Sequence, residues 1–311
     1  MSAHAPRSID EYLKQLRAAL EGQDPALIQD ALYDDEEYLR AEVAAHPNKS
    51  EADVLELIAS TYGAPEEVAA AYRDTEAKVR AALKTPVPAA ASGTSGWRRF
   101  FGVYLDPRSY TSLFYMLLTL ATGIVYFTIV VTGMSLSFGF AILIIGIPFF
   151  LAFIAITRVI ALGEGRLIEA ISGERMPRRP VHPGPPASWW TRIGEMLTDV
   201  RTWTTLAYLL LMLPLGIIYF VIAVTGLAVS AALIGTPLTL IGEHLGMLDW
   251  SLNDHIFWRA GEPWTFGHPV FDSLLLLVLG VLLLTVLLHL ARGLVRVHAR
   301  LAKSMLVVPG P

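Results

Sequence analysis

Four long apolar stretches constrain this chain more than any other feature of its sequence. They cover residues 113–132, 138–157, 206–225 and about 270–290. A helix needs about 20 apolar residues to cross the hydrocarbon core of a bilayer, and each stretch supplies them. With 54% hydrophobic and 17% charged residues, the 311-residue chain is too apolar for a plain water-soluble enzyme. We therefore expect an all-α protein whose larger part is a polytopic four-helix transmembrane domain.

Residues 1–84 have the opposite character, because they contain no apolar stretch of membrane length. They hold 9 Lys and Arg against 17 Asp and Glu, a net charge of −8, whereas the rest of the chain carries a net +4. This pattern predicts a small, soluble, acidic helical domain, joined through a Pro-, Ala-, Gly- and Ser-rich linker at residues 85–96. Without a net-basic soluble domain, we expect no direct nucleic-acid binding.

Capping residues divide the soluble domain into four predicted helices. Ser and Asp side chains accept hydrogen bonds from free N–H groups at helix starts, and Pro is favoured at the first helical position. The predicted starts follow the caps Ser8, Asp24 and Ser50 or fall at Pro65, and the predicted ends fall at Gly22, before Pro47 and at Gly63.

The distribution of Lys and Arg predicts the orientation of the spans. Of the 15 basic residues after Lys84, 14 lie before the first span, between the second and third, or after the fourth. Because cytoplasmic loops are enriched in Lys and Arg, both termini are expected in the cytoplasm and residues 226–272 outside. Residues 227–242 form a further apolar run, which we interpret as an interfacial or re-entrant segment because a fifth span would invert the basic C-terminal end.

An internal repeat organises the membrane part. At an offset of 93 residues, Asp106-Pro-Arg-Ser-Tyr110 matches Asp199-Val-Arg-Thr-Trp203, and the following helices match at an offset of 134. The matched positions include Arg108 with Arg201, Tyr126 with Tyr219, Thr132 with Thr225, and Arg158 with Arg292. The pattern predicts two duplicated helical hairpins, residues 97–198 and 199–311, the second with an outward insertion at about 227–270. Thr132-Gly133 and Thr225-Gly226 are expected to end the first span of each hairpin.

The repeated residues resemble a known pattern. Asp-x-Arg-x-Tyr/Trp, then Gly-Ile-x-Tyr-Phe, Val-Thr-Gly, Gly-Ile-Pro and a downstream Arg are similar to the membrane sensor domain found ahead of actinobacterial histidine kinases. The resemblance covers residues 100–305 as two copies. It implies a multi-pass module of the bacterial cytoplasmic (inner) membrane that detects envelope signals.

The soluble domain resembles a second family. Tyr12-Leu-x-x-Leu-Arg17, the acidic second helix and Gly63-Ala-Pro-Glu-Glu-Val-Ala69 are similar to the HAAS-type (DUF1700-like) signalling domain. In that family the domain precedes membrane segments and is often encoded beside a PadR-like transcription regulator. The resemblance implies a regulatory partner and no chemistry.

Candidate site residues are few. The weak metal candidates are His244, His255 and His268, whose spacing fits no known zinc pattern. The chain has no Cys and no phosphate-binding or nucleotide-binding motif, so we expect no cofactor and no catalytic residue. Asp34-Asp35-Glu36-Glu37 is either a solvated face or a docking site for a basic partner. Arg175, Arg178 and Arg179 either set the topology or make an anionic-lipid or signalling contact.

These observations favour a non-enzymatic membrane sensor that couples an envelope signal to a cytoplasmic partner, for which the HAAS resemblance implies a PadR-like regulator. The alternative is a membrane subunit of a transporter or channel, although the spans offer almost no ionisable groups to line a path. An outward-facing metal hydrolase would depend only on the histidines and acidic residues of the outer loop. The expected partners are the lipid bilayer and the regulator, and the sequence is also compatible with a homo-oligomer.

Overall fold

A computed structural model describes residues 6–83, 96–140, 146–179, 189–244, 258–259, 262–263 and 269–307. The fold is all-α, as predicted, and the strands in this described part are the two-residue pair β1 (Trp258–Arg259) and β2 (Glu262–Pro263). The chain divides into two compact units. The first comprises residues 1–91, 128–210 and 298–311, and the second residues 92–127 and 211–297.

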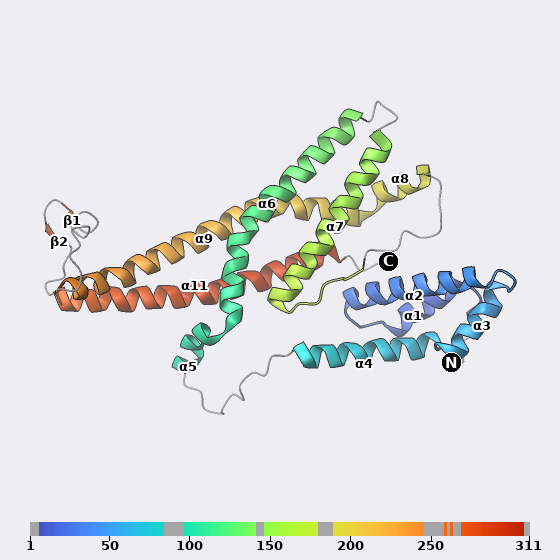
Figure 1. The fold of residues 1–311 in the computed structure, drawn as a ribbon, viewed down its shortest axis with the longest axis horizontal. Coiled ribbons are helices and arrows are strands. Elements are labelled where there is room, and N and C mark those ends of the chain that lie inside the picture. The colour runs from blue at the N-terminus through green and yellow to red at the C-terminus, as the bar shows by residue number, and fades with distance from the viewer. Residues whose placement is uncertain are drawn as a thin grey trace. The chain divides into compact units, whose positions relative to one another are not determined.

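The first unit begins with four short helices, here called the helical module (residues 6–83). They are α1 (Ile9–Ala19), α2 (Pro25–Ala45), α3 (Glu51–Thr61) and α4 (Pro65–Leu83). Figure 1 draws them in blue to cyan. The remaining helices are α5 (Gly96–Phe101), the 3₁₀ turn η1 (Gly102–Leu105), α6 (Pro107–Phe140), α7 (Gly146–Ser172), α8 (Trp189–Thr198), α9 (Val200–His244) and α11 (Pro269–Leu306).

The predicted caps of the helical module are confirmed. The Ser8 hydroxyl accepts from the Glu11 N–H, and the Asp24 carboxylate accepts from the Ala26 N–H. Ser50 and Asp53 form a reciprocal capping box, in which each side chain accepts a hydrogen bond from the other residue's backbone N–H. Gly63 has φ +126°, in a region that L side chains rarely adopt, which fixes the turn between α3 and α4.

Two apolar clusters hold the helical module together. The first joins α1, α2 and α3 and the second joins α1, α2 and α4. The buried members of the first are Tyr12, Leu39, Val54, Leu55 and Ile58, and those of the second are Leu16, Leu20, Ala31, Val68 and Ala69. The Tyr12 hydroxyl also donates a hydrogen bond of 3.0 Å to the Gly63 carbonyl, which ties α1 to the α3–α4 turn.

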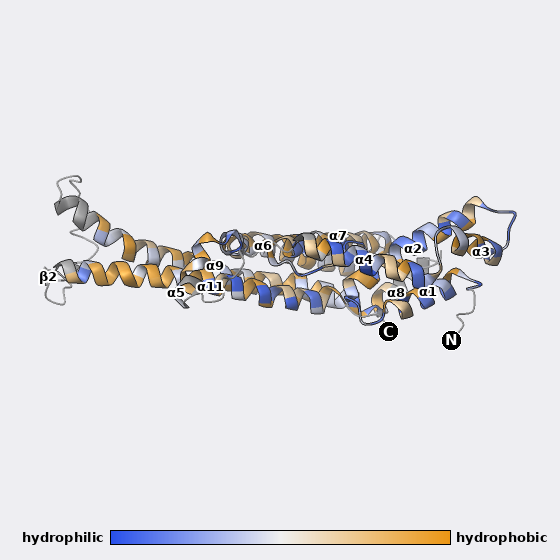
Figure 2. Ribbon diagram, turned by 90° about the horizontal axis from the view of Figure 1, so that it is seen from below, coloured by the Kyte–Doolittle hydropathy of each residue, from blue (hydrophilic) through white to orange (hydrophobic). Residues whose placement is uncertain are grey.

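Four helices, α6, α7, α9 and α11, are long and apolar enough to cross a membrane. Figure 2 shows these helices largely in the hydrophobic colour, whereas the helical module carries many hydrophilic positions. The predicted start of the second span was wrong. The second helix begins at Gly146 instead of residue 138, because residues 138–140 still belong to α6.

Residues 227–242 do not form a separate interfacial or re-entrant segment. They continue α9, which runs unbroken for 45 residues to His244 with Pro214 and Pro237 inside it. This is about twice the length needed to cross a bilayer. The predicted helix ends at Thr132-Gly133 and Thr225-Gly226 were wrong for the same reason, since both helices continue past them.

The glycines of the repeat serve close packing instead of helix termination. In the second unit, a Cβ on Gly123 would lie 2.6 Å from the Met212 carbonyl oxygen, and one on Gly216 would lie 2.5 Å from that of Thr119. Both contacts require backbones to approach more closely than any side chain allows. A Cβ on Gly133 would likewise meet the Phe153 ring, and one on Gly226 would meet Leu287.

Candidate signalling interface

The Asp-x-Arg-x-aromatic motif forms a polar corner at the start of α6. One Asp106 oxygen accepts from the Arg108 N–H at 3.0 Å and caps the helix, while the other receives Nη1 of Arg292 at 2.9 Å. The Tyr110 hydroxyl donates back to the Tyr104 carbonyl at 2.9 Å. All these residues lie in the second unit. The motif therefore fixes the start of a membrane helix and attaches α11 to it.

The matching motif forms the same contacts at the start of α9, within the first unit. An Asp199 oxygen accepts from the Arg201 N–H at 3.0 Å, and the other lies 3.5 Å from Nη2 of Arg158. The Trp203 indole N–H donates to the Leu197 carbonyl at 2.8 Å, as Tyr110 does in the first motif. In both corners the arginine comes from the other predicted hairpin.

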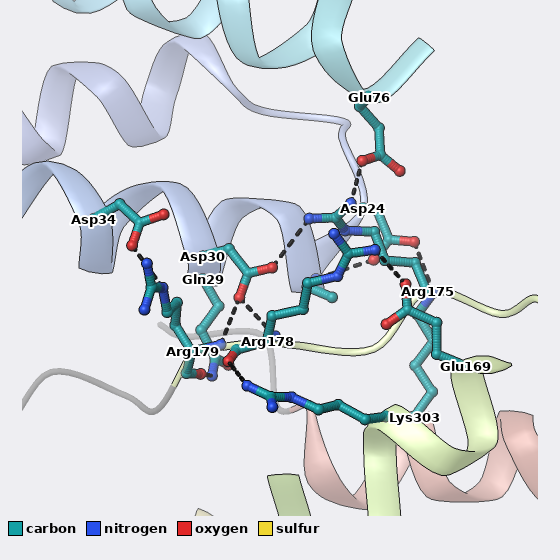
Figure 3. Close-up of polar contacts among 12 residues, drawn as sticks. Asp24, Gln29, Asp30, Asp34, Glu76, Glu169, Arg175, Arg178, Arg179 and Lys303 are labelled. Atoms are coloured by element: carbon teal, nitrogen blue, oxygen red, sulfur yellow. Dashed lines mark hydrogen bonds and ion pairs between the residues drawn. The ribbon is translucent and has the colours of Figure 1, made fainter. Parts of the chain in front are cut away.

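The segment that follows α7, residues 173–179, lies on the helical module and is here called the arginine segment. The Arg175 guanidinium of this segment donates to Asp30 of α2 at 3.0 Å and also to Glu76 of α4 (Figure 3). The three side chains are 13%, 9% and 8% exposed, so this is a buried charge pairing. Removing one partner of such a group costs about 3–5 kcal/mol, because the other charges stay buried without compensation.

Asp30 accepts hydrogen bonds from backbone as well as side chain. One oxygen accepts the Arg178 N–H at 2.8 Å and the Arg179 N–H at 2.9 Å, while the other receives Arg175 (Figure 3). Burial raises the pKa of this carboxyl, and the two N–H groups and Arg175 offset part of the rise. Asp30 thus fixes both the path of the segment and the position of its first arginine.

Further ion pairs surround this contact. Nε of Arg179 lies 2.8 Å from Asp34, and the Arg179 guanidinium stands 5.9 Å from the centre of the Tyr33 ring. Nζ of Lys303, near the end of α11, donates to Asp24 at 2.7 Å and to Glu174 at 3.0 Å. The contact therefore joins α2 and α4 of the helical module to the ends of two membrane helices.

The Sensor family model, described as "Putative sensor", matches residues 115–306. The chain belongs to the Sensor family. The matched region is a single one and includes all of α7, α9 and α11 and most of α6. No curated protein and no solved structure matches the chain. Sensor is a signalling family and not an enzyme family. The four long apolar helices of this chain make it a multi-pass membrane protein.

The predicted acidic docking run of this Sensor protein is not a uniform charged face. Asp34 pairs with Arg179 and Glu36 pairs with Arg40 at 2.7 Å, while Glu37 is exposed. Asp35 is fully buried, and burial raises its pKa to about 6, although the Tyr72 and Tyr62 hydroxyls offset part of the rise.

The repeat-matched positions have different surroundings in the Sensor region. Tyr219 is buried in a cluster with Met116, Ala223 and Ala291, whereas Tyr126 is half-buried. Thr132 and Thr225 are exposed. The clearest correspondence is at the corners, where Arg158 and Arg292 each pair with an aspartate.

The metal candidates receive no support from the Sensor structure. His255 and His268 lie outside the described residues, and His244 is the last residue of α9. Within the described ranges, no group of three or more His, Asp or Glu side chains could hold a metal ion.

Sequence reasoning missed the acidic partners of the arginine segment. It singled out Arg175, Arg178 and Arg179 but not Asp30, Glu76, Asp24 or Lys303. The available signal was the opposite charge of the two regions, since three arginines within five residues face a domain of net charge −8. That signal identifies neither the helix nor the face, because the arginines are 99 to 149 residues away from their partners in the module.

Proposed function

We propose that this chain is a non-enzymatic sensor of the bacterial cytoplasmic membrane that relays an envelope signal to its N-terminal helical module. The observation that supports this most directly is the pairing of Arg175 with Asp30 and Glu76, from two helices of the module. A buried pairing of this kind is sensitive to small displacements, because hydrogen bonds weaken steeply away from their optimal geometry. A shift of α7 would change how the arginine segment sits on the module.

The membrane part would supply two alternative arrangements of duplicated hairpins. The matched corners at Asp106 and Asp199, and the matched close approaches at Gly123 and Gly216, support an internal duplication of the membrane part. A ligand or lipid state that favours one arrangement would shift the population by its differential affinity for the two.

The partner of the helical module would be a cytoplasmic regulator with a basic surface. The HAAS-like sequence of the module favours a PadR-like transcription regulator, and the acidic charge of the module supports a basic partner. Holding such a regulator at the membrane would connect the envelope state to transcription. In the described part of the chain, no comparable observation supports a transporter or channel.

Labelled protein tests the relay directly, because the chain has no Cys and two introduced cysteines carry all the label. Glu56→Cys on α3 and Ala170→Cys on α7, both exposed, would report the distance between module and membrane helix in nanodiscs. We expect Arg175→Gln to lengthen and broaden this distance and Arg296→Gln, a matched loss of charge on α11, to leave it unchanged. An unchanged distribution in Arg175→Gln would contradict the relay.

Co-purification tests the partner, and reporter fusions test the orientation. The full chain isolated from native membranes should carry a transcription regulator, whereas an attached ATPase would favour the transport alternative. A reporter after Lys303 should be cytoplasmic and one near Trp258 external. The reverse result would place the helical module outside and remove the proposed partner.

A further inference from the structure

The arginine segment lies on the helical module as a bound peptide would. Residues 173–179 have no helix or strand, since Gly173 at φ +75° ends α7 and Pro177 interrupts the segment. The Arg175 and Arg179 side chains and the Arg178 and Arg179 backbone N–H groups hold it on α2 and α4 (Figure 3). The Arg178 side chain instead pairs with Glu169 of α7 at 2.7 Å. A short segment without regular secondary structure that lies on a helical surface has the arrangement of a bound peptide ligand.

The surface beneath it, formed by Asp30, Asp34, Glu76 and Tyr33, recognises guanidinium groups. Arg175 uses separate nitrogens for Asp30 and Glu76, which a planar fork of donors can do and a single ammonium does less well. Arg179 combines the Asp34 carboxylate with the face of Tyr33, a pairing of ion pair and cation–π contact. This chemistry fits an arginine-bearing partner segment better than a lysine-bearing one.

We propose that the arginine segment occupies, in cis, the surface with which the helical module binds an arginine-bearing segment of its partner. The contact is therefore autoinhibitory: the partner binds when movement of α7 withdraws the segment. This inference rests on the proposed function and adds to it the surface, the chemistry of the partner and the reason for regulation.

Tethering makes the competition effective. Because the segment and its site belong to one chain, the segment acts at an effective concentration set by the connection between them, and it competes with partners of similar intrinsic affinity. The arginine segment begins one residue after the end of α7, and its last residue is seven positions from that end. Its position on the module is thus directly coupled to the position of that helix.

A peptide with the sequence of residues 173–179 tests the proposal as a partner of known chemistry. Fluorescently labelled peptide is titrated onto the full chain in nanodiscs of neutral lipid, with binding followed by polarisation. We expect weak binding to the unaltered protein. The triple variant R175Q/R178Q/R179Q should bind at least about tenfold more tightly, because the cis competitor is gone.

Two controls separate recognition from general charge. Adding Asp30→Asn and Glu76→Gln to the triple variant should abolish the gain, and a peptide with its arginines replaced by lysine should bind several-fold more weakly. The variant R296Q/R300Q removes charge from α11 and should show no gain. Circular dichroism reports whether the module stays helical. If the triple variant loses helical content, the double variant R178Q/R179Q, which keeps Arg175 in place, is used instead. Its expected increase in peptide affinity is smaller.

An equal affinity in the unaltered protein and in whichever folded variant is used would overturn the proposal. So would a gain that survives loss of Asp30 and Glu76. The distance between labels at positions 56 and 170 tests the relay separately. If Arg175→Gln changes this distance but no peptide competition is seen, only this inference is contradicted. Peptide competition without a change in that distance contradicts the relay.

Discussion

The helical module and the long membrane helices obtain their cohesion from different contacts. The module buries large side chains such as Tyr12, Leu16 and Leu55 completely between short, capped helices. The second unit instead brings α6 and α9 together at Gly123 and Gly216, where backbone lies against backbone. Water drives the first kind of packing through the hydrophobic effect. The second depends on close van der Waals contact, since lipid tails are as apolar as leucine.

The largest effect is expected where the membrane helices cross. Gly216→Leu would force a side chain against the Thr119 carbonyl, so the helices must separate and the fold should lose about 3 kcal/mol or more. We expect most of the protein to aggregate when purified in detergent, as measured by size-exclusion chromatography. Gly139→Leu is the matched control, because nothing lies within 4 Å of a Cβ there. Equal yields of the two variants would contradict the crossing.

The next effect is expected in the core of the helical module. A fragment of residues 1–84 should fold alone, because both of its apolar clusters are internal. In it, Leu55→Ala should lower the free energy of unfolding by about 2–5 kcal/mol through lost burial and a residual cavity. Leu57→Ala, at an exposed position on the same helix, should change it by less than about 1 kcal/mol. Urea denaturation followed by circular dichroism gives both values, and a random-coil fragment would refute the module's independence.

A buried charge inside that core makes the module depend on pH. Asp35 has a pKa of about 6 in the folded state against an ordinary 3.8, so the folded module holds its proton more tightly than the unfolded chain. The difference makes folding about 3 kcal/mol more favourable below pH 4, and this stabilisation is lost as pH rises through about 6. Its environment includes Tyr72, Tyr62, Tyr12 and Asp34.

Asp35→Asn should therefore stabilise the module at pH 7.5 by about 1–3 kcal/mol and flatten its stability between pH 4 and 7. Denaturation curves of the 1–84 fragment at several pH values measure this. Asp34→Asn, at a partly exposed neighbouring position, should leave the slope in place. A fragment that gains stability as pH rises through 6 would mean that Asp35 is ionised and satisfied in the fold.

The two regions also differ in how far the sequence predicts them. Caps at Ser8, Asp24 and Ser50 were predicted correctly because each acts within four residues along the chain. The separate segment predicted at residues 227–242 was wrong, because these residues continue α9. An apolar composition shows that a helix can lie in lipid, but it does not show where the helix ends. Membrane helices carry fewer stop signals, because proline and glycine are tolerated inside them.

The candidate interface was predicted only in its basic half. Arginines before and after spans are visible in the sequence, but Asp30 and Glu76 resemble the other acidic residues of an acidic domain. What distinguishes them is burial beneath the arginine segment. That burial arises from tertiary packing between positions about 100 to 150 apart, which no local pattern encodes.

The smallest effect is expected at the two corners, and it tests whether matched motifs are energetically equal. Asp106→Asn and Asp199→Asn each keep a side-chain oxygen that can cap the helix while removing the charge that faces an arginine. Each aspartate is about a third exposed, so each change should cost less than about 1 kcal/mol. The Asp106 change should cost more, because Arg292 lies 2.9 Å away, whereas Arg158 lies 3.5 Å from Asp199 and also contacts the Thr202 hydroxyl at 3.4 Å.

Thermal unfolding of the two variants in detergent at low and high salt makes the comparison quantitative. Salt screens exposed charges, so the difference between unaltered protein and variant should shrink as salt is added, and more for Asp106 than for Asp199. Thr202→Val provides the complementary change, since it leaves Arg158 with Asp199 alone and should increase the salt dependence of that corner. Identical losses at both corners, independent of salt, would show that the aspartates act only as helix caps and that the arginines contribute nothing measurable.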